Sequence, residues 1–333
     1  ITPGLFFTFN NNTYSGLYNG QGNSKTPLKI VATGLVFNIV LDPLLIYGCG
    51  FIPAMGSAGA AVATTFSQLV VFAIFIRNLY FRESSIGKLH YLTRLRARFV
   101  KRIFSLGFPV SMQSALFAMF SLTLATVAAQ WGHIGVAVQS VGAQIEAITW
   151  MTAAGFSTAL AAFTGQNFGA RDFVRIRQGY HYTLKLAGGI ALVATAAFLF
   201  LSKEIFSIFI NEPQTLIAGS AYLKILAVSQ VFSAIEQVTA GAFNGCGRTT
   251  PPAIVGILLT GARIPLAFYL VTFPILGLNG IWWSISISSV LKGIVLTLWY
   301  LSFQKKLQNG SYKPTGILGQ MHAVASRLWQ QLH

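Results

Sequence analysis

Long uncharged apolar runs alternate along the chain with short breaks marked by polar residues, glycine or proline. The runs fall at residues 1–19, 28–48, 57–76, 103–130, 134–165, 186–202, 214–243, 252–275 and 280–303. Each run is long enough for a helix of roughly 17 to 25 residues that crosses a bilayer. The two-residue alternation of barrel strands is missing from them. The pattern predicts an all-α integral membrane protein with nine membrane-spanning helices.

Composition supports this interpretation, because 54% of the residues are hydrophobic and only 9% are charged, against about 25% charged in a soluble domain. The net charge of +16 raises the question of nucleic acid binding. However, nineteen of the 23 basic residues fall in the connections on one side of the predicted spans, and the opposite connections contain only Lys203. This asymmetry is the positive-inside pattern. It predicts a cytoplasmic C-terminus, contact with anionic headgroups on the cytoplasmic side, and no binding of nucleic acid.

The chain lacks the motifs of several enzyme and pump classes. Its two cysteines, Cys49 and Cys246, lie on opposite sides of the predicted membrane, so a disulfide between them is not expected. The sequence contains no His pair at ligand spacing, no P-loop and no Gly-x-Ser-x-Gly. We therefore expect no metal site and no cofactor, and we expect that the protein is not an enzyme.

An internal repeat is visible in two Asn-Gly-x-Gly motifs, "LYNGQGNSKTP" at 17–27 and "AFNGCGRTTPP" at 242–252, which match at a constant offset of 225 residues. These two motifs are called the corners below. A second match, of Gly56 with Gly277 and of Gly59 with Gly280, has an offset of 221. An even number of predicted spans separates the two corners. Both halves should therefore cross the membrane in the same sense, as in the parallel repeats of secondary transporters.

The offset also predicts a domain organisation. The second repeat opens near residue 99, and its counterpart would lie upstream of Ile1. We therefore expect that three helices are absent and that nine of twelve spans, in two six-helix lobes, are present; a protein of nine spans is the alternative. The predicted parts are the second half of the first lobe at 1–80, a basic cytoplasmic linker at 81–98, the second lobe at 99–304 and a cytoplasmic tail at 305–333.

A charged side chain within a membrane costs about 2.5 to 3.5 kcal/mol on insertion scales, so each one needs a reason. Glu236 lies nine residues before Gly245, about 13 Å from the corner along a helix, and its counterpart in the repeat is Asn11. Glu146 follows Gln139 and Gln144 in an apolar run. Both acids are candidates for coupling ion movement to transport. A protonated or paired carboxylate that only ties helices together is the alternative.

Asp42, the third coupling candidate, precedes Pro43 near the end of its run, and a cap or an ion pair with Arg263 is the preferred interpretation. Lys292 receives no role. The residues predicted to line a cavity or a substrate site are Asn10, Asn11, Gln113, Gln139, Gln144, Ser233, Gln237 and Arg263. For Gln113, hydrogen bonds within the helix packing are the preferred interpretation, and cavity lining is the alternative.

Several strings together resemble the multidrug and toxic compound extrusion (MATE) family: "NIVLDPLLIYG", "GQNFGARDF", "SLGFPVSMQS" and the paired corners followed by proline. The resemblance runs from residue 1 to about 304. It implies a bundle of twelve helices in two lobes, a central cavity, and antiport of a substrate against inward Na⁺ or H⁺. Flippases of polysaccharides and lipid-linked precursors share this fold.

One departure from the family concerns the coupling ion. Na⁺-coupled members carry a Glu eight residues after the proline of the seventh helix and an Asp twelve residues before the glycine of the second corner. Phe117 and Ser233 occupy these positions here, so the resemblance does not extend to that Na⁺ site. Other members use an Asp in the first helix, which would lie upstream of this chain.

The expected function is therefore that of a monomeric multi-pass exporter in the plasma membrane. Its substrate would be a small amphipathic, often cationic, organic compound, exchanged by alternating access for a proton or, as the second choice, Na⁺. A flippase of lipid-linked saccharides or polysaccharides is the alternative within the same fold. A membrane scaffold or receptor without transport is the alternative from a different class.

Overall fold

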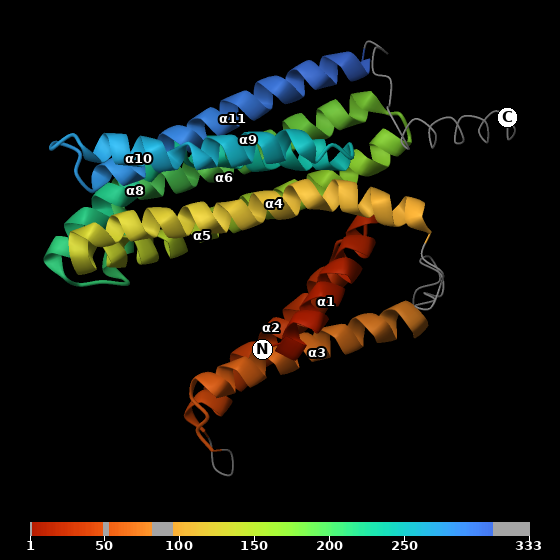
Figure 1. Ribbon diagram of the computed structural model, residues 1–333. Helices are drawn as coiled ribbons and strands as arrows, with labels where there is room; N and C mark the ends of the chain where they lie inside the picture. The colour runs from red at the N-terminus through yellow and green to blue at the C-terminus, as the bar shows by residue number, and fades with distance from the viewer. Residues whose placement is uncertain (1, 49–52, 82–95, 309–333) are drawn as a thin grey trace, which may run out of the picture. The chain divides into compact units, whose positions relative to one another are not determined.

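The computed structural model describes residues 2–48, 53–81 and 96–308, and these residues contain helices and no strand (Figure 1). Cys49, most of the predicted linker and the tail from residue 309 lie outside the described residues. The helices are α1 (Thr2–Gly20), α2 (Lys25–Tyr47), α3 (Ser57–Phe81), α4 (Ala97–Ala128), the short 3-10 helix η1 (Ala129–Trp131), α5 (Gly132–Gly169), α6 (Phe173–Phe200), α7 (Ser202–Ser207), α8 (Pro213–Gly245), α9 (Thr250–Gly261), α10 (Arg263–Val271) and α11 (Asn279–Gln308). The all-α prediction is confirmed.

Seven segments of the described residues are long and apolar enough to cross a membrane, and one of them, Ala97–Gly169, contains both α4 and α5. Eight of the nine predicted runs overlap these segments over most of their length. The exception is the first run, which forms α1 but falls short of the apolarity of the others. The reason is its polar content, above all Asn10, Asn11 and Asn12.

The run at 252–275 differs from the prediction in another way, because it forms two helices, α9 and α10. Pro265 lies two residues after the start of α10. Proline has no backbone N–H, so it cannot donate to the carbonyl of Gly261 one turn earlier, and the helical ladder is interrupted there. The break makes Arg263 the first residue of a new helix.

The two corners of the repeat have the same backbone structure. The N–H of Gly22 donates to the carbonyl of Asn19, and that of Gly247 donates to the carbonyl of Asn244, each at 2.9 Å. The next N–H in each corner donates five residues back at 3.0 Å, to Tyr18 O and Phe243 O. Gly22 and Gly247 have φ of 81° and 68°, which is the left-handed conformation that glycine adopts most readily at a helix C-terminus. The repeated motif thus ends α1 and α8 in the same way.

The second sequence match is repeated in the packing. A Cβ atom at Gly59 would lie 2.3 Å from the carbonyl oxygen of Leu45, and one at Gly280 would lie 2.8 Å from the carbonyl carbon of Leu270. Leu45 and Leu270 are themselves 225 residues apart. In both copies the start of a helix therefore approaches the backbone of the preceding helix too closely for any side chain. In the internal repeat, therefore, α1 corresponds to α8, α2 corresponds to α9 together with α10, and α3 corresponds to α11.

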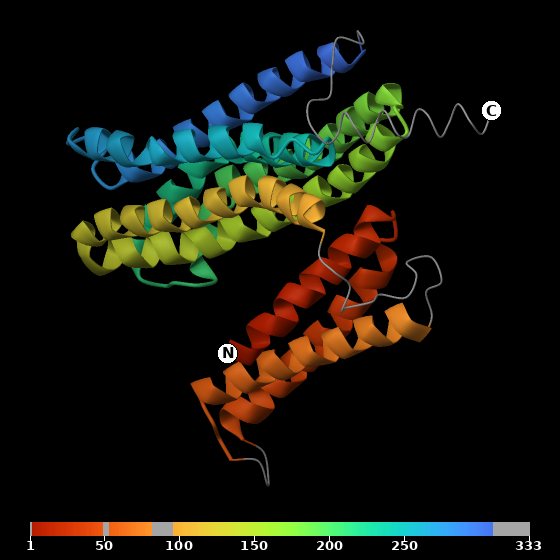
Figure 2. The same ribbon diagram turned by 45° about the vertical axis from the view of Figure 1, so that its right-hand side comes forward.

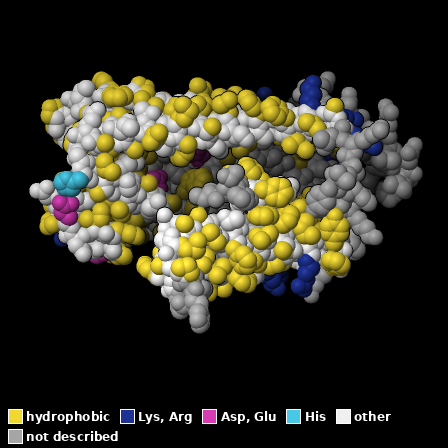
Figure 3. Space-filling view, turned by 60° about the horizontal axis from the view of Figure 1, so that its bottom comes forward, with side chains coloured by type: hydrophobic (Ala, Val, Ile, Leu, Met, Phe, Trp, Pro, Cys, Tyr) yellow, Lys and Arg dark blue, Asp and Glu magenta, His cyan; other side chains and the backbone are white. Residues whose placement is uncertain are grey.

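The chain divides into two compact units, one from Ile1 to Lys101 and one from Arg102 onward. In the first unit α3 packs against α1 and α2, and its core holds Tyr14, Tyr18 and Phe75. In the second unit α8 packs against α5, α6 and α11 (Figure 2). Two cores form along α8, one that includes Tyr222 and Trp282 and another that includes Phe243 and Tyr300. Many large hydrophobic side chains remain exposed (Figure 3), as expected of surfaces in contact with lipid.

A prediction follows from the positive φ of Gly247. Replacing Gly247 with alanine should lower the free energy of unfolding by about 1 to 2 kcal/mol, because the added Cβ disfavours the left-handed conformation. Gly188 lies within α6 with nothing near the position of its missing Cβ, so Gly188→Ala is the matched control and should not destabilise. Unfolding in mixed detergent micelles measures both variants. Equal stability of Gly247→Ala and wild type would contradict the prediction.

Candidate functional site

A buried ion pair joins α8 to α11 in the second unit. The Nζ atom of Lys292 lies 2.9 Å from Oε2 of Glu236, and the side chains are 9% and 14% exposed. The two helices are packed along their length, which brings these residues together although 56 positions separate them in the sequence. Glu236 therefore has an ionic partner in the structure, and its predicted role in coupling stays a prediction. Such a pair is stable only while both partners are present.

Arg263, at the break between α9 and α10, is buried beside this pair. Its Nε donates a hydrogen bond to Oγ of Ser288, and its Nη2 donates to Oγ of Ser289 at 2.9 Å. Both serines lie on α11, within about one turn of Lys292. The guanidinium also interacts electrostatically with Glu146 and Glu236. The break between α9 and α10 therefore places the guanidinium of Arg263 near the Glu236–Lys292 ion pair.

Glu146, on α5, completes the cluster. Its carboxylate interacts electrostatically with Arg263 and Lys292, and its only side-chain hydrogen bond among the described residues is a long one of 3.5 Å from the hydroxyl of Tyr222. The described residues form no salt bridge with it. The buried charge cluster (Glu146, Glu236, Arg263 and Lys292) therefore contains two acids and two bases, and Glu146 is the acid without a close ionic partner.

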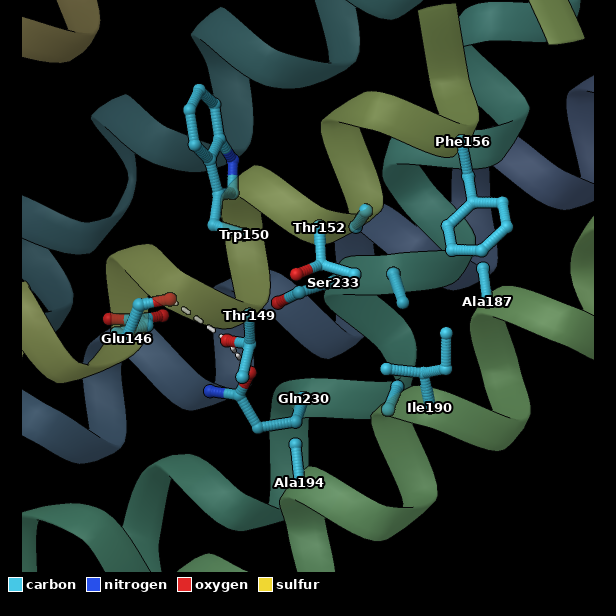
Figure 4. A pocket seen from close by; sticks show the side chains of 13 residues that line it. Glu146, Thr149, Trp150, Thr152, Phe156, Ala187, Ile190, Ala194, Gln230 and Ser233 are labelled. Carbon is cyan, nitrogen blue, oxygen red and sulfur yellow. Dashed lines mark hydrogen bonds between the residues drawn. The ribbon is translucent and has the colours of Figure 1, made fainter. Parts of the chain in front are cut away.

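A small pocket lies beside Glu146 between α5, α6 and α8 (Figure 4). Thr149 lies between two of its polar groups, with Oγ1 2.8 Å from the carbonyl oxygen of Glu146 and 2.9 Å from Oε1 of Gln230. The buried Nε2 of Gln230 has no hydrogen-bond partner among the described residues. The lining consists of Glu146, Thr149, Trp150, Thr152, Ala153, Phe156, Ala187, Ile190, Ala191, Ala194, Gln230, Ser233 and Ala234. An apolar pocket with a few polar groups is typical of small-molecule sites.

The predicted site residues of the first unit make hydrogen bonds within that unit. Asn10 Nδ2 donates to Phe6 O at 2.8 Å, and Asn38 donates to Asp42 Oδ1 at 3.2 Å. The buried Asn11 donates to Gln68, both to its carbonyl and to its Oε1, at 3.0 Å. Asp42 thus accepts a hydrogen bond within its own helix, and its predicted ion pair with Arg263, which lies in the other unit, stays a prediction.

Asn11 is the repeat counterpart of Glu236, and the two occupy equivalent places. Asn11 connects α1 to α3 through Gln68, and Glu236 connects α8 to α11 through Lys292. In each copy of the repeat, a polar side-chain contact joins the helix that ends at the corner (α1 or α8) to the last helix of that copy (α3 or α11). The contact is neutral in one copy and ionic in the other.

The remaining predicted residues are dispersed. Gln113 lies against α9, where a Cβ at Gly256 would come within 2.3 Å of its Nε2. Gln139 is half-buried, Gln144 is exposed and Gln237 is half-buried. The pocket lining includes none of these four, while it does include Glu146 and Ser233.

Several members of the site were not predicted from the sequence. Lys292 received no role, and Tyr222, Thr149, Ser288 and Ser289 were not selected. A signal for α11 was present in "SISISSVLK", where serines precede the buried lysine in an otherwise apolar run. Tyr222 and Thr149 carry no signal, because their importance comes only from the packing of α5 on α8.

The described residues contain no group of three His, Cys, Asp or Glu side chains that could hold a metal ion. Cys246, just beyond the end of α8, is buried, and burial raises the pKa of its thiol to about 12. It is therefore an uncharged thiol at neutral pH and a poor ligand or nucleophile.

The repeat, the apolar helices and the buried charge cluster define a multi-pass helical membrane protein built from two related halves. The family model described as MatE matches residues 109–269. A "Probable multidrug resistance protein NorM" of Thermotoga maritima is 29% identical over 87% of this chain, and a "FAD transporter" of Shewanella oneidensis is 26% identical over 82%. A crystal structure of MATE in the straight conformation superposes with a TM-score of 0.85 at 26% identity, over 92% of this chain.

The chain is therefore similar to MATE transporters over most of its length. The MATE transporters that it resembles are transport proteins and not enzymes. The chain spans 62% of the length of the Thermotoga protein, 60% of the Shewanella protein and 68% of the chain in that crystal structure.

Proposed function

We propose that the protein is a secondary active exporter that moves amphipathic, often cationic, organic compounds outward in exchange for inward protons. The single observation that carries the proposal is Glu146, a carboxylate inside an apolar bundle that lines a pocket and lacks a close ionic partner. The names of the relatives, which refer to multidrug resistance, support export of drug-like compounds.

The geometry favours Glu146 over Glu236 as the coupling group. Glu236 is held by Lys292 at 2.9 Å, so proton binding there would break a buried ion pair and leave a buried lysine uncompensated. Glu146 can gain or lose a proton while this pair stays intact. Glu236 then serves to position α8 against α11, as Asn11 does for α1 and α3.

The pocket also suggests how substrate and proton compete. A cationic substrate would be attracted by the carboxylate of Glu146 and by the faces of Trp150 and Phe156, which line the same pocket. Protonation of Glu146 removes that attraction. One group would then bind either the substrate or the proton, which is the requirement for exchange.

A proton suits this site better than Na⁺. A sodium ion would need several oxygen ligands close to Arg263 and Lys292, both of which interact electrostatically with Glu146. A proton binds a single carboxylate oxygen and takes no additional volume. The presence of Phe117 and Ser233 where Na⁺-coupled members carry acids supports the same conclusion.

Polyanionic substrates are less well supported. One relative is named a FAD transporter, and flippases act on pyrophosphate-linked lipids. In this chain the two cations of the buried charge cluster are matched by two acids, so the cluster has no net positive charge to attract a polyanion. We propose further that the protein is a monomer in the cell membrane with its basic connections and C-terminus in the cytoplasm, beside anionic headgroups.

The test is transport by proteoliposomes that contain the protein. Glu146→Gln should lower transport of a fluorescent cationic drug driven by a pH gradient at least tenfold, since glutamine cannot exchange a proton. Glu204→Gln, which replaces an exposed glutamate of α7, is the matched control and should transport normally. Glu236→Gln should mainly reduce stability. Unchanged transport by Glu146→Gln would refute Glu146 as the coupling group, and transport driven by Na⁺ but not by protons would refute the proposed ion.

A further inference from the structure

A second pocket lies on the surface of the second unit, away from the buried charge cluster. It is lined by Lys203 of α7 and by residues that form one face of α8, namely Leu216, Ile217, Ser220, Ala221 and Lys224. Both lysines are exposed, and neither forms a salt bridge among the described residues. One end of the pocket is therefore cationic and its wall on α8 is largely apolar.

The positions of these lysines are unusual for a membrane protein. Nineteen of the 23 basic residues fall in the connections on the other side of the predicted spans, and Lys203 is the exception in the sequence. Lys224 lies in the segment Pro213–Gly245, which is long and apolar enough to cross the membrane, eleven residues from its start. An exposed lysine at this depth, about 16 Å along the helix, is costly unless its side chain extends to a polar or anionic group at the interface.

The two lysines are held in a fixed relation, because α7 is anchored on α8 by two contacts. The ring of Phe206 is fully buried and occupies the space at Gly219, where an added Cβ would lie 2.4 Å from it. The hydroxyls of Ser202 and Ser220 are hydrogen-bonded at 2.8 Å. Lys203 follows Ser202 in the chain, and Lys224 follows Ser220 by one helical turn. The pocket is thus a preformed feature of the fold.

We propose that this pocket binds an anionic phospholipid, with its phosphate between Lys203 and Lys224 and its acyl chain along the apolar face of α8. The charge of the lysines matches the headgroup, and the exposed side chain of Ile217, 72% exposed, offers the chain an apolar surface. The small residues Ser220 and Ala221 leave room between them. The site is separate from the proposed coupling group and does not depend on it.

The test compares lipids that share acyl chains and differ in headgroup. Dioleoyl phosphatidylglycerol added to the purified protein in neutral detergent should raise its melting temperature more than dioleoyl phosphatidylcholine does. The double variant Lys203→Gln/Lys224→Gln should weaken the apparent affinity for phosphatidylglycerol about tenfold or more. Lys185→Gln, which replaces an exposed lysine of α6, is the matched control and should leave the affinity unchanged.

Three results would overturn the proposal. They are an equal response to both lipids, an equal loss of affinity in the Lys185 variant, and an unchanged affinity in the double variant. Inorganic phosphate alone should give no comparable stabilisation, and an equal effect of phosphate would show an anion site instead of a lipid site. None of these results depends on transport, so the lipid site and the proposed exporter function can fail independently.

Discussion

Replacing Lys292 with methionine should lower the free energy of unfolding by about 3 to 5 kcal/mol, which is the usual loss when one partner of a buried ion pair is removed. The variant leaves the carboxylate of Glu236, 14% exposed, without its cation. Methionine has nearly the same length and volume as the lysine stem, so packing is largely retained. The loss therefore reports the uncompensated charge. Unfolding in mixed detergent micelles at neutral pH measures it.

Two further variants isolate the electrostatic contribution. The double variant Glu236→Gln/Lys292→Met removes both charges and should recover much of the stability, a coupling that a double-mutant cycle quantifies. Lys224→Met, on the exposed side of α8, removes a lysine that has no salt bridge among the described residues and should have little effect. If the double variant were as unstable as Lys292→Met, shape and not charge would explain the loss.

Replacing Gly241 with leucine should destabilise the protein by about 3 kcal/mol or more, because it forces α5 and α8 apart. A Cβ at Gly241 would lie 2.4 Å from the carbonyl oxygen of Ser157, and one at Gly245, a turn later, 2.5 Å from that of Ala161. Small residues four positions apart on one helix are typical of close packing in membranes. The obstacle here is backbone, which cannot move aside as a side chain can, so the effect should exceed ordinary overpacking.

The matched control is Gly155→Leu on α5. Gly155 is exposed and nothing lies near the position of its missing Cβ, so leucine there should be tolerated and helix propensity should improve slightly. Both variants are compared by thermal melting in detergent and by yield of folded protein. A normal melting temperature for Gly241→Leu would mean that α5 and α8 do not approach as closely as the structure shows.

The charged residues show how far sequence reasoning extends. Glu146 and Glu236 were identified from the cost of a charge inside an apolar run, which is a local property. The partners of Lys292 and Arg263, in contrast, depend on which helices pack together. Lys292 forms an ion pair with Glu236 because α8 packs on α11. Arg263 donates hydrogen bonds to Ser288 and Ser289, because the helix is interrupted near Pro265 and a new helix begins at Arg263. Neither pairing has a constant spacing that a sequence pattern could reveal.

The spacing of Gln139, Gln144 and Glu146 could not show which helices complete the pocket beside Glu146, for the same reason. Helical spacing places residues on one face of a helix, but the other helices that pack nearby decide whether that face contacts protein, a pocket or the surroundings. Among the described residues, Gln144 is exposed and the pocket wall beside Glu146 is completed by α6 and α8 instead. The tertiary arrangement also supplied Thr149 and Gln230, two residues 81 positions apart that are joined by a hydrogen bond.

The amino-acid sequence by itself determined that this is an all-α membrane protein, that it contains a parallel repeat, and that its corners recur with an offset of 225 residues. Apolar run length, charge asymmetry and the special conformations of glycine are all properties of short segments, so they can be recognised along the chain. Only the tertiary structure decided which acid is paired and which has no close cation. That distinction depends on contacts between helices far apart in the sequence, which no constant spacing along the chain reveals.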